Sequence, residues 1–339
     1  MSEYKNLIII LLAALAAFAV SMLISPFVIK ITERIKAGQP ILKYLEHHEK
    51  KVGTPTMGGF IFIIPAALIT LSVGYNRLSL VAVLTAASYG IVGFLDDFIK
   101  VRRGMNEGLK PYQKVVGQLG IAVIATLFAY YNDGIGTSVK VPFSVFEVDL
   151  GIWFIPFSIF VFVAVTNSVN LTDGIDGLAG GSGAAAFAAF SAAGILYYLE
   201  AAHYGAAAFA DGLFSLAVFS AVFSCSLLGF LWKNAGPSRI FMGDTGSLAI
   251  GGGLAAAAIF MRNPLILPIV CAVYVWSSVS VILQVAFFKA AKRRIFKMSP
   301  FHHHLELKGY SEAKITTFYT VVTIAAGLVG IISVILNLS

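Results

Sequence analysis

Charged residues are scarce in this chain. Lys, Arg, Asp and Glu make up 12% of its 339 residues, whereas 58% are hydrophobic; an average soluble domain carries about twice that charged share. Cysteine is nearly absent, and Cys225 and Cys271 both fall in apolar runs. That placement favours small buried side chains over a disulfide or a metal pair. Long polar loops are also lacking, so we expect residues 1–339 to form a single integral-membrane domain.

Long apolar runs, in contrast, recur along the whole chain, and their lengths suit membrane-spanning helices. They predict an all-α polytopic membrane protein with about ten transmembrane helices. The predicted spans are residues 7–27, 57–73, 78–95, 115–131, 152–166, 178–199, 213–231, 247–261, 265–288 and 315–336.

Basic residues are shared unevenly between the two sets of alternating loops. Twenty of the 24 Lys and Arg residues lie in one set, and the other set holds only Lys5, Arg77, Lys140 and Arg262. Basic loops remain in the cytoplasm, so the first set is predicted to be cytoplasmic and both termini to lie outside. This distribution also accounts for the net charge of +7 without a nucleic-acid partner.

The outer side has one sizeable segment, residues 132–151. It begins with turn residues (NDGIG) and then alternates apolar and polar residues from 137 to 150. This pattern predicts a short β-hairpin on the outer membrane surface.

Five aspartates lie at the inner ends of predicted spans, namely Asp96, Asp97, Asp173, Asp176 and Asp244. Membrane geometry places them at one depth although they are far apart in sequence, and carboxylates at membrane depth usually mark a functional site. Asp173 and Asp176 are three residues apart, so a helical turn there would put both carboxylates on one face. We therefore expect an acidic site for a divalent cation that carries phosphates.

Two glycine-rich segments accompany the aspartates, GTPTMGG at 53–59 and FMGDTGS at 241–247. Backbone N–H groups at helix starts bind anions, which suits phosphate. In the last inner loop, residues 289–297 are predicted to continue the ninth helix with a basic surface suited to anionic lipid. Pro300 is then expected to break that helix ahead of His302, His303 and His304.

Simpler roles compete with these functional ones. Asp244 could equally cap the helix that follows it. Asp96 and Asp97 lie at a helix C-terminus, where the macrodipole opposes negative charge, so capping is not expected of them. The three histidines could form a solvated loop or a non-specific transition-metal site.

Five motifs follow one another along the chain and read GTPTMGG, GFLDDFIK, NSVNLTDGIDGLAGG, FMGDTGS and SPFHHHLELKGYSE. Together they resemble one family, the phospho-N-acetylmuramoyl-pentapeptide transferases of the polyprenyl-phosphate N-acetylhexosamine-1-phosphate transferase superfamily. The aspartates are shared by the superfamily, whereas PFHHHLE points to the muramoyl-pentapeptide branch.

The resemblance implies a reaction and its location. Undecaprenyl phosphate and UDP-MurNAc-pentapeptide would give lipid I and UMP, with Mg²⁺ as cofactor, in the first membrane step of peptidoglycan biosynthesis. The enzyme would lie in the bacterial cytoplasmic (inner) membrane, with periplasmic termini and a cytoplasmic active site.

The resemblance also implies residue roles. Asp96, Asp97, Asp244 and His303 would be catalytic, with Asp96 as a base or positioning group, and Asp244 and Asp173 would bind the metal. The substrate-binding residues would be Lys51, Thr56, Lys114, Asn167, Asn170, Asp173, Asp176, Asn234, Phe241, Gly243, Ser247, His302 and His304. Direct attack by the lipid phosphate and a covalent aspartyl intermediate both remain open, with direct attack favoured because the phosphate is already ionised.

Two rival functions can be compared with this one. A sister enzyme would move N-acetylglucosamine-1-phosphate onto the same lipid. A proton- or cation-coupled transporter would place acids near mid-membrane along a through-path, whereas here they gather at one edge. The apolar outer faces and glycine-rich helices would permit a homodimer.

Overall fold

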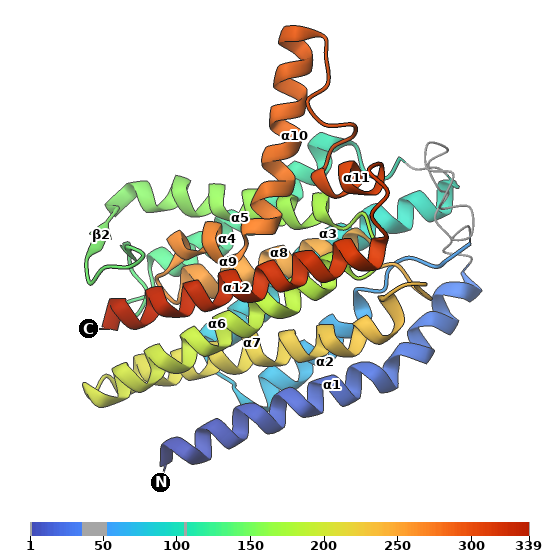
Figure 1. The fold of residues 1–339 in the computed structure, drawn as a ribbon. Helices are drawn as coiled ribbons and strands as arrows, with labels where there is room; N and C mark the ends of the chain where they lie inside the picture. The colour runs from blue at the N-terminus through green and yellow to red at the C-terminus, as the bar shows by residue number, and fades with distance from the viewer. Residues whose placement is uncertain (1, 36–52, 105–106, 339) are drawn as a thin grey trace.

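The computed structural model of the protein describes residues 2–35, 53–104 and 107–338 (Figure 1). Its long helices are α1 (Ser2–Arg34), α2 (Phe60–Val73), α3 (Arg77–Arg103), α4 (Pro111–Tyr130), α5 (Phe154–Thr172), α6 (Leu178–His203), α7 (Ala207–Asn234), α8 (Gly243–Phe260), α10 (Ala272–Ala291) and α12 (Glu312–Leu338). Shorter elements are β1 (Ser138–Lys140), β2 (Glu147–Asp149), η2 (Gly151–Trp153), η3 (Pro264–Ile266), α9 (Leu267–Val270) and α11 (Phe301–Glu306).

A helix occupies each of the ten predicted stretches, but not all of them qualify as spans. Within the described residues, eight helices are long and apolar enough to cross a membrane. The two others are α2, which has 14 residues, and α8, which opens with the polar residues of its first turn. A polytopic helical membrane protein is thus confirmed, with eight candidate spans.

The prediction of one continuous ninth span over 265–288 was wrong. The chain there forms η3 and α9, and α10 begins only at Ala272. Pro264 and Pro268 lie in the first turns of η3 and α9. A residue without a backbone N–H is tolerated there and not inside a helix, so the two prolines favour separate helix starts within this stretch.

The basic segment 289–297 continues helix α10 only through Ala291, so the prediction was wrong for residues 292–297. The helix ends at Ala291, where Lys292 adopts a left-handed conformation with φ of 53°. The side chain of Gln284 then accepts hydrogen bonds from the N–H groups of Ile295 and Phe296, at 3.1 and 3.0 Å. Figure 1 shows α10 projecting from the bundle and the chain after it turning back toward α11. Pro300 precedes α11 instead of ending α10.

The core of the bundle is formed by α6, α7 and α8. Every residue of α8 from Thr245 to Phe260 is buried, and α8 contacts both α3 and α5. At the periphery, α1 leaves Leu23, Phe27 and Ile31 largely exposed. Because α8 is enclosed, its polar first turn is presented inside the bundle, beside the ends of α3 and α5.

One end of the bundle carries the predicted hairpin. β1 and β2 pair antiparallel with Val139 opposite Val148. The hairpin is thus confirmed, whereas its place on the outer membrane surface remains a prediction. Ser333 and Asn337 of α12 hold the connecting turn, since Ser333 accepts a hydrogen bond from Phe143 N–H and Asn337 donates one to the Val141 carbonyl. Both termini lie at this same end (Figure 1). That they are periplasmic remains a prediction.

Candidate active site

Three of the five predicted aspartates meet in space. Asp96 and Asp97 from the last part of α3 and Asp244 from the first turn of α8 each place one carboxylate oxygen within 4.8 Å of the others. Asp96 is 3% exposed and Asp97 is fully buried. Burying three carboxylates together is costly unless positive charge or hydrogen bonds compensate. The surroundings of the cluster provide both.

Close contact between the α3 and α8 backbones brings these aspartates together. A β-carbon on Gly93 of α3 would lie 2.0 Å from the carbonyl oxygen of Asp244. No side chain fits in that space, so glycine allows α8 to begin directly against α3. One helical turn later α3 carries Asp96 and Asp97.

Asp97 caps the start of α8. Its Oδ1 accepts a hydrogen bond from Asp244 N–H at 3.2 Å, and its Oδ2 accepts from the N–H and hydroxyl of Thr245 at 3.0 and 2.7 Å. The expectation that capping could not explain Asp97 was wrong. It considered only the helix to which Asp97 belongs, whereas the carboxylate stabilises the positive N-terminus of a different helix.

Asp244 itself does not cap α8; its carboxylate is held by other side chains. Lys114 Nζ lies 2.7 Å and Lys100 Nζ 3.1 Å from Oδ2. Asn170 Nδ2 donates to Oδ1 at 2.7 Å. Charge-assisted contacts of this kind fix a carboxylate in both position and orientation.

Lys100 is a site residue that the sequence reasoning missed. Its ammonium bridges two aspartates, since it also lies 2.6 Å from Asp96 Oδ2. The four-residue spacing of Asp96 and Lys100 on one helix could have revealed the pair. Asp96 Oδ1 additionally accepts a hydrogen bond from Leu109 N–H at 2.8 Å.

The two predicted asparagines of α5 have different partners. Asn170 joins α5 to α8 through Asp244 and through Ser247 Oγ, which accepts a hydrogen bond from its amide at 2.9 Å. Asn167 instead donates to Gln118 Oε1 and to the Val163 carbonyl, both at 2.8 Å. Asn167 therefore supports the α4–α5 contact behind the cluster.

Asp173 and Asp176 lie in the turn after α5, not on one helical turn. Asp173 is the C-cap residue that follows the last residue of α5. Asp176 Oδ2 accepts a hydrogen bond from Ser238 N–H at 3.1 Å. Burial, together with the charges of Asp244, Asp97 and Asp176, raises the pKa of Asp173 well above its usual value. Asp173 is not one of the three carboxylates grouped within 4.8 Å in the described part of the chain, so its role as a metal ligand stays a prediction.

Two of the three histidines, His302 and His303, lie against the Asp173–Gly177 turn at Gly174. A β-carbon on Gly174 would lie 2.5 Å from His302 Nε2 and 3.1 Å from His303 Nε2. His302 is fully buried; burial and the neighbouring His303 hold its pKa well below the usual value. His303 Nδ1 lies 2.6 Å from Glu306 Oε2, which orients the ring. His304 Nδ1 accepts a hydrogen bond from Lys297 N–H at 3.0 Å and so serves the loop.

The remaining predicted residues lie at the start of α8 and in the segments that contact it. Gly243 has φ of +72°, and a β-carbon there would lie 2.4 Å from Asp97 Oδ2 and 2.6 Å from Thr56 Oγ1. Phe241 pairs through its backbone with Pro55 and Gly58. Asn234 accepts from Gly177 N–H and donates to the Ile240 carbonyl, both at 3.0 Å. Lys51, the remaining predicted residue, lies outside the described residues.

The donor set at the cluster suits a hard divalent cation. Carboxylate and amide oxygens are the ligands that Mg²⁺ and Ca²⁺ prefer. Asp96, Asp244 and Asn170 can supply them, whereas the oxygens of Asp97 already hold the start of α8. The ammonium groups of Lys100 and Lys114 hold the carboxylates in place and are also suited to phosphate oxygens. The arrangement can therefore assemble a cation and a diphosphate at one end of the bundle.

Comparison with known proteins identifies the class to which the chain belongs. The profile of the family described as glycosyl transferase family 4 matches residues 79–262, the segment that runs from α3 through α8 and contains all five aspartates. A buried carboxylate cluster at the end of a helical membrane bundle thus belongs to a membrane-embedded transferase of that class.

Relatives that match almost the whole chain indicate which family within this class it belongs to. The chain is 42% identical over 327 residues to a phospho-N-acetylmuramoyl-pentapeptide-transferase of Clostridium novyi, covering 95% of this chain and 96% of the relative. The same name is carried by relatives from Clostridium kluyveri, with 41% identity over 95% of this chain and 98% of the relative, and from Thermoanaerobacter pseudethanolicus, with 42% over 94% and 96%. The chain belongs to the phospho-N-acetylmuramoyl-pentapeptide transferase family.

Proposed function

We propose that this protein transfers phospho-MurNAc-pentapeptide from UDP-MurNAc-pentapeptide to undecaprenyl phosphate, which gives lipid I and UMP in peptidoglycan biosynthesis. The observation that carries the proposal is the convergence of Asp96, Asp97 and Asp244 within 4.8 Å, in a chain whose relatives bear this enzyme's name over almost their whole length. One substrate is a lipid and the other is soluble, so a site at one end of the bundle can receive both.

We assign the cofactor as Mg²⁺, held by Asp244 with Asp96 and, as a further candidate, Asp173. Bound there, the ion would neutralise diphosphate charge as it develops on the departing UMP. Asp97 has its oxygens engaged by three hydrogen bonds from the start of α8. Asp244 also has three polar contacts, but they come from the side chains of Lys100, Lys114 and Asn170, which can move when an ion binds. Two of the donors to Asp97 are backbone N–H groups of α8, so we assign Asp97 as a positioning residue for Asp244.

The chain's own residues provide the rest of the electrostatic stabilisation. Lys100 and Lys114 already contact Asp244, and their ammonium groups can hold phosphate oxygens in line. The Asp173–Gly177 turn, Asn234 and the buried His302 would bind the nucleotide-sugar. His303, oriented by Glu306, would contact the sugar or the diphosphate, and Lys51 and Thr56 would help to hold phosphate.

The reaction is best written as direct attack. An oxygen of the lipid phosphate forms a bond to the sugar-bearing phosphorus, and the bond from that phosphorus to the UMP oxygen breaks. The lipid phosphate is already ionised near neutral pH, so Asp96 needs only to position it. Its carboxylate is held by Lys100 at 2.6 Å and by Leu109 N–H, which restrains it from acting as a free nucleophile.

Isotope exchange tests the two routes. Purified enzyme, UDP-MurNAc-pentapeptide and radiolabelled UMP are incubated without undecaprenyl phosphate. Direct attack predicts no label in the sugar nucleotide, because UMP leaves only when the lipid phosphate attacks. Label incorporation would show a covalent aspartyl intermediate.

The overall activity is tested with membranes, undecaprenyl phosphate and a radiolabelled panel of UDP-MurNAc-pentapeptide and UDP-N-acetylglucosamine. We expect labelled lipid and UMP only with the muramoyl-pentapeptide donor, and no turnover after chelation of divalent cations. Transfer of N-acetylglucosamine-1-phosphate alone would replace this proposal with the sister activity. Residence in a bacterial inner membrane with the site facing the cytoplasm belongs to the same proposal. A homodimer remains a prediction.

A further inference from the structure

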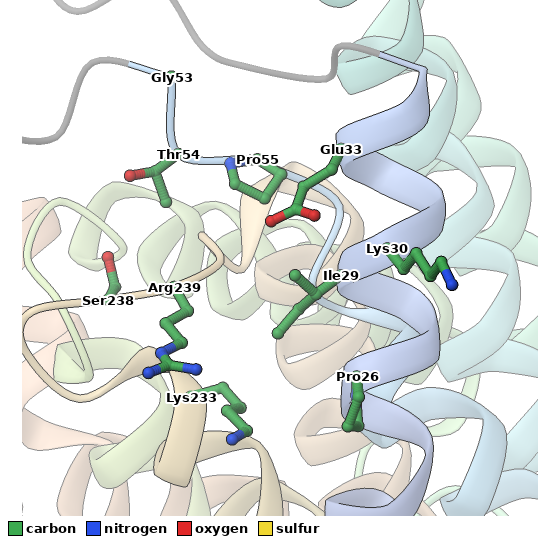
Figure 2. A pocket seen from close by; sticks show the side chains of 10 residues that line it. All are labelled: Pro26, Ile29, Lys30, Glu33, Gly53, Thr54, Pro55, Lys233, Ser238 and Arg239. Carbon is green, nitrogen blue, oxygen red and sulfur yellow. The ribbon is translucent and has the colours of Figure 1, made fainter.

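A cavity with both charged and apolar lining residues lies between the end of α1 and the segment that follows α7. Its volume is about 840 Å³, and it is bounded by the last turns of α1, the 53–55 segment and the chain that follows α7 (Figure 2). The lining residues are Pro26, Ile29, Lys30, Glu33, Gly53, Thr54, Pro55, Lys233, Ser238 and Arg239. None of these residues has a role in the transfer reaction proposed above.

Charge is distributed unequally across this cavity. Arg239 and Lys233 form one side, and Glu33 and Ile29 of α1 point toward them from the other, while the side chain of Lys30 points away (Figure 2). Within the described parts of the chain, neither Arg239 nor Lys233 takes part in an ion pair. The cavity therefore offers two cations to an anion and one carboxylate to a hydrogen-bond donor.

The wall of the cavity is continuous with a lipid-facing surface. Leu23, Phe27 and Ile31 follow one another at four-residue spacing on α1 and are 69%, 69% and 59% exposed. The cavity residues Pro26, Lys30 and Glu33 lie on the adjoining stripe of the same helix. Since α1 is a candidate membrane span, its exposed apolar stripe faces acyl chains.

The neighbouring helix α7 also changes from exposed apolar side chains to a cationic side chain as it reaches the cavity. Leu228 and Trp232 of α7 are 45% and 68% exposed, one turn apart, and Lys233 follows directly. Exposed tryptophan marks the level of lipid headgroups. Apolar surface thus reaches the cavity from both helices and gives way to cations where headgroups would lie.

We propose that this cavity binds the headgroup of an anionic glycerophospholipid. Arg239 and Lys233 hold the phosphate, Glu33 accepts a hydrogen bond from a headgroup hydroxyl, and the acyl chains follow the exposed stripe of α1. The cavity adjoins the Asp173–Gly177 turn, because Ser238 in its wall donates its N–H to Asp176 at 3.1 Å. The inference rests on the cavity and on the exposed apolar faces of α1 and α7, and it is independent of the transfer chemistry.

Tryptophan quenching provides the test. In a full-length W153F/W276F protein, Trp232 is the single remaining tryptophan beside the cavity. The protein is reconstituted in phosphatidylcholine vesicles with increasing spin-labelled phosphatidylglycerol or, separately, spin-labelled phosphatidylcholine. Each basic side chain at an anionic membrane surface contributes roughly a fivefold gain in binding. We therefore expect about a 25-fold preference for phosphatidylglycerol at Trp232.

Substitutions then locate the preference. K233Q/R239Q should reduce it to near one, and K233Q alone should reduce it about fivefold. R102Q/R103Q, which removes the same charge from the exposed end of α3, should leave it unchanged. Equal loss in both double variants would mean general surface electrostatics and would overturn the proposal.

The source of the anion is tested in the same assay. Millimolar inorganic phosphate or UMP should not abolish the preference, because neither supplies acyl chains. Abolition by either would assign the cavity to a soluble anion and reject the lipid. Absence of any preference in the unsubstituted protein would reject it as well.

Discussion

Replacing Asp97 by Asn tests whether this buried carboxylate acts by holding α8. The substitution keeps the size of the side chain, but one oxygen becomes an NH₂ group that must face backbone or hydroxyl donors. At least one charge-assisted hydrogen bond is lost from the three that Asp97 accepts, together with its interaction with the helix dipole. Since Asp97 is fully buried, we expect a loss of about 2–4 kcal/mol in stability.

Three measurements test this role of Asp97. Thermal unfolding in detergent should occur roughly 4–8 °C lower, at about 2 °C per kcal/mol for a chain of this size. Lipid I formation should fall about 100-fold, since displacing a catalytic group by about 1 Å has that effect. The Mg²⁺ concentration for half-maximal activity should change less than threefold.

Thr245→Val is the matched control for Asp97. It removes only the hydroxyl hydrogen bond of 2.7 Å, so about 1 kcal/mol and a small part of the activity should be lost. If Asp97→Asn unfolds at the unsubstituted temperature and instead requires far more Mg²⁺, Asp97 is a metal ligand and the capping argument is wrong.

Four further outcomes are expected. Asp244→Asn should abolish lipid I formation while the protein still inserts and unfolds cooperatively; near-normal turnover would remove Asp244 from the metal site. Gly243→Ala should lower activity more than tenfold because its β-carbon would meet Asp97 and Thr56. In the control variant Gly309→Ala, activity should stay within twofold of the unsubstituted protein, since Gly309 has φ of +92° and open space around it. Similar activities in the two variants would contradict the crowding argument. The pKa of His302 is lowered in the folded protein, so its contribution to stability should be full above about pH 6.5 and decline below it as the unfolded chain takes up a proton. The temperature of thermal unfolding should therefore fall between pH 7.5 and pH 5, and His302→Gln should make this pH dependence weaker. An unchanged pH dependence in His302→Gln would show that His302 is not its origin. His303→Ala should raise the KM for the sugar nucleotide more than that for undecaprenyl phosphate, and equal effects on both would argue against a sugar or diphosphate contact.

Secondary structure was largely predictable wherever a long apolar run had no internal break. The runs at 178–199 and 213–231 became α6 and α7 with only their ends extended, because hydropathy over a membrane thickness leaves few alternatives to a helix. The run at 265–288 failed because hydropathy does not register two prolines near its start. The turn at Lys292 depends on Gln284 capturing backbone N–H groups eleven and twelve residues away.

The sequence predicted which aspartates form the site, but not which residues these aspartates contact. Asp96, Asp97 and Asp244 were all expected from the sequence, since membrane topology places the ends of alternate spans at one depth. Lys100 was overlooked because a basic residue in such a loop is ordinary, and its bridging position depends on where Asp244 lies. The capping role of Asp97 was missed for the same reason, as it requires α8 to begin against α3.

The sequence by itself determined that the chain is a helical membrane protein, which of its loops are basic, and which residue types are available for cation and phosphate chemistry. These properties follow from composition and from spacing along one chain. The tertiary structure alone decided which carboxylate holds a helix, which carboxylate is held by lysines, and how Gly174 admits the histidines. Those assignments depend on distances of a few ångströms between helices, and such distances result from side-chain packing that no local pattern encodes.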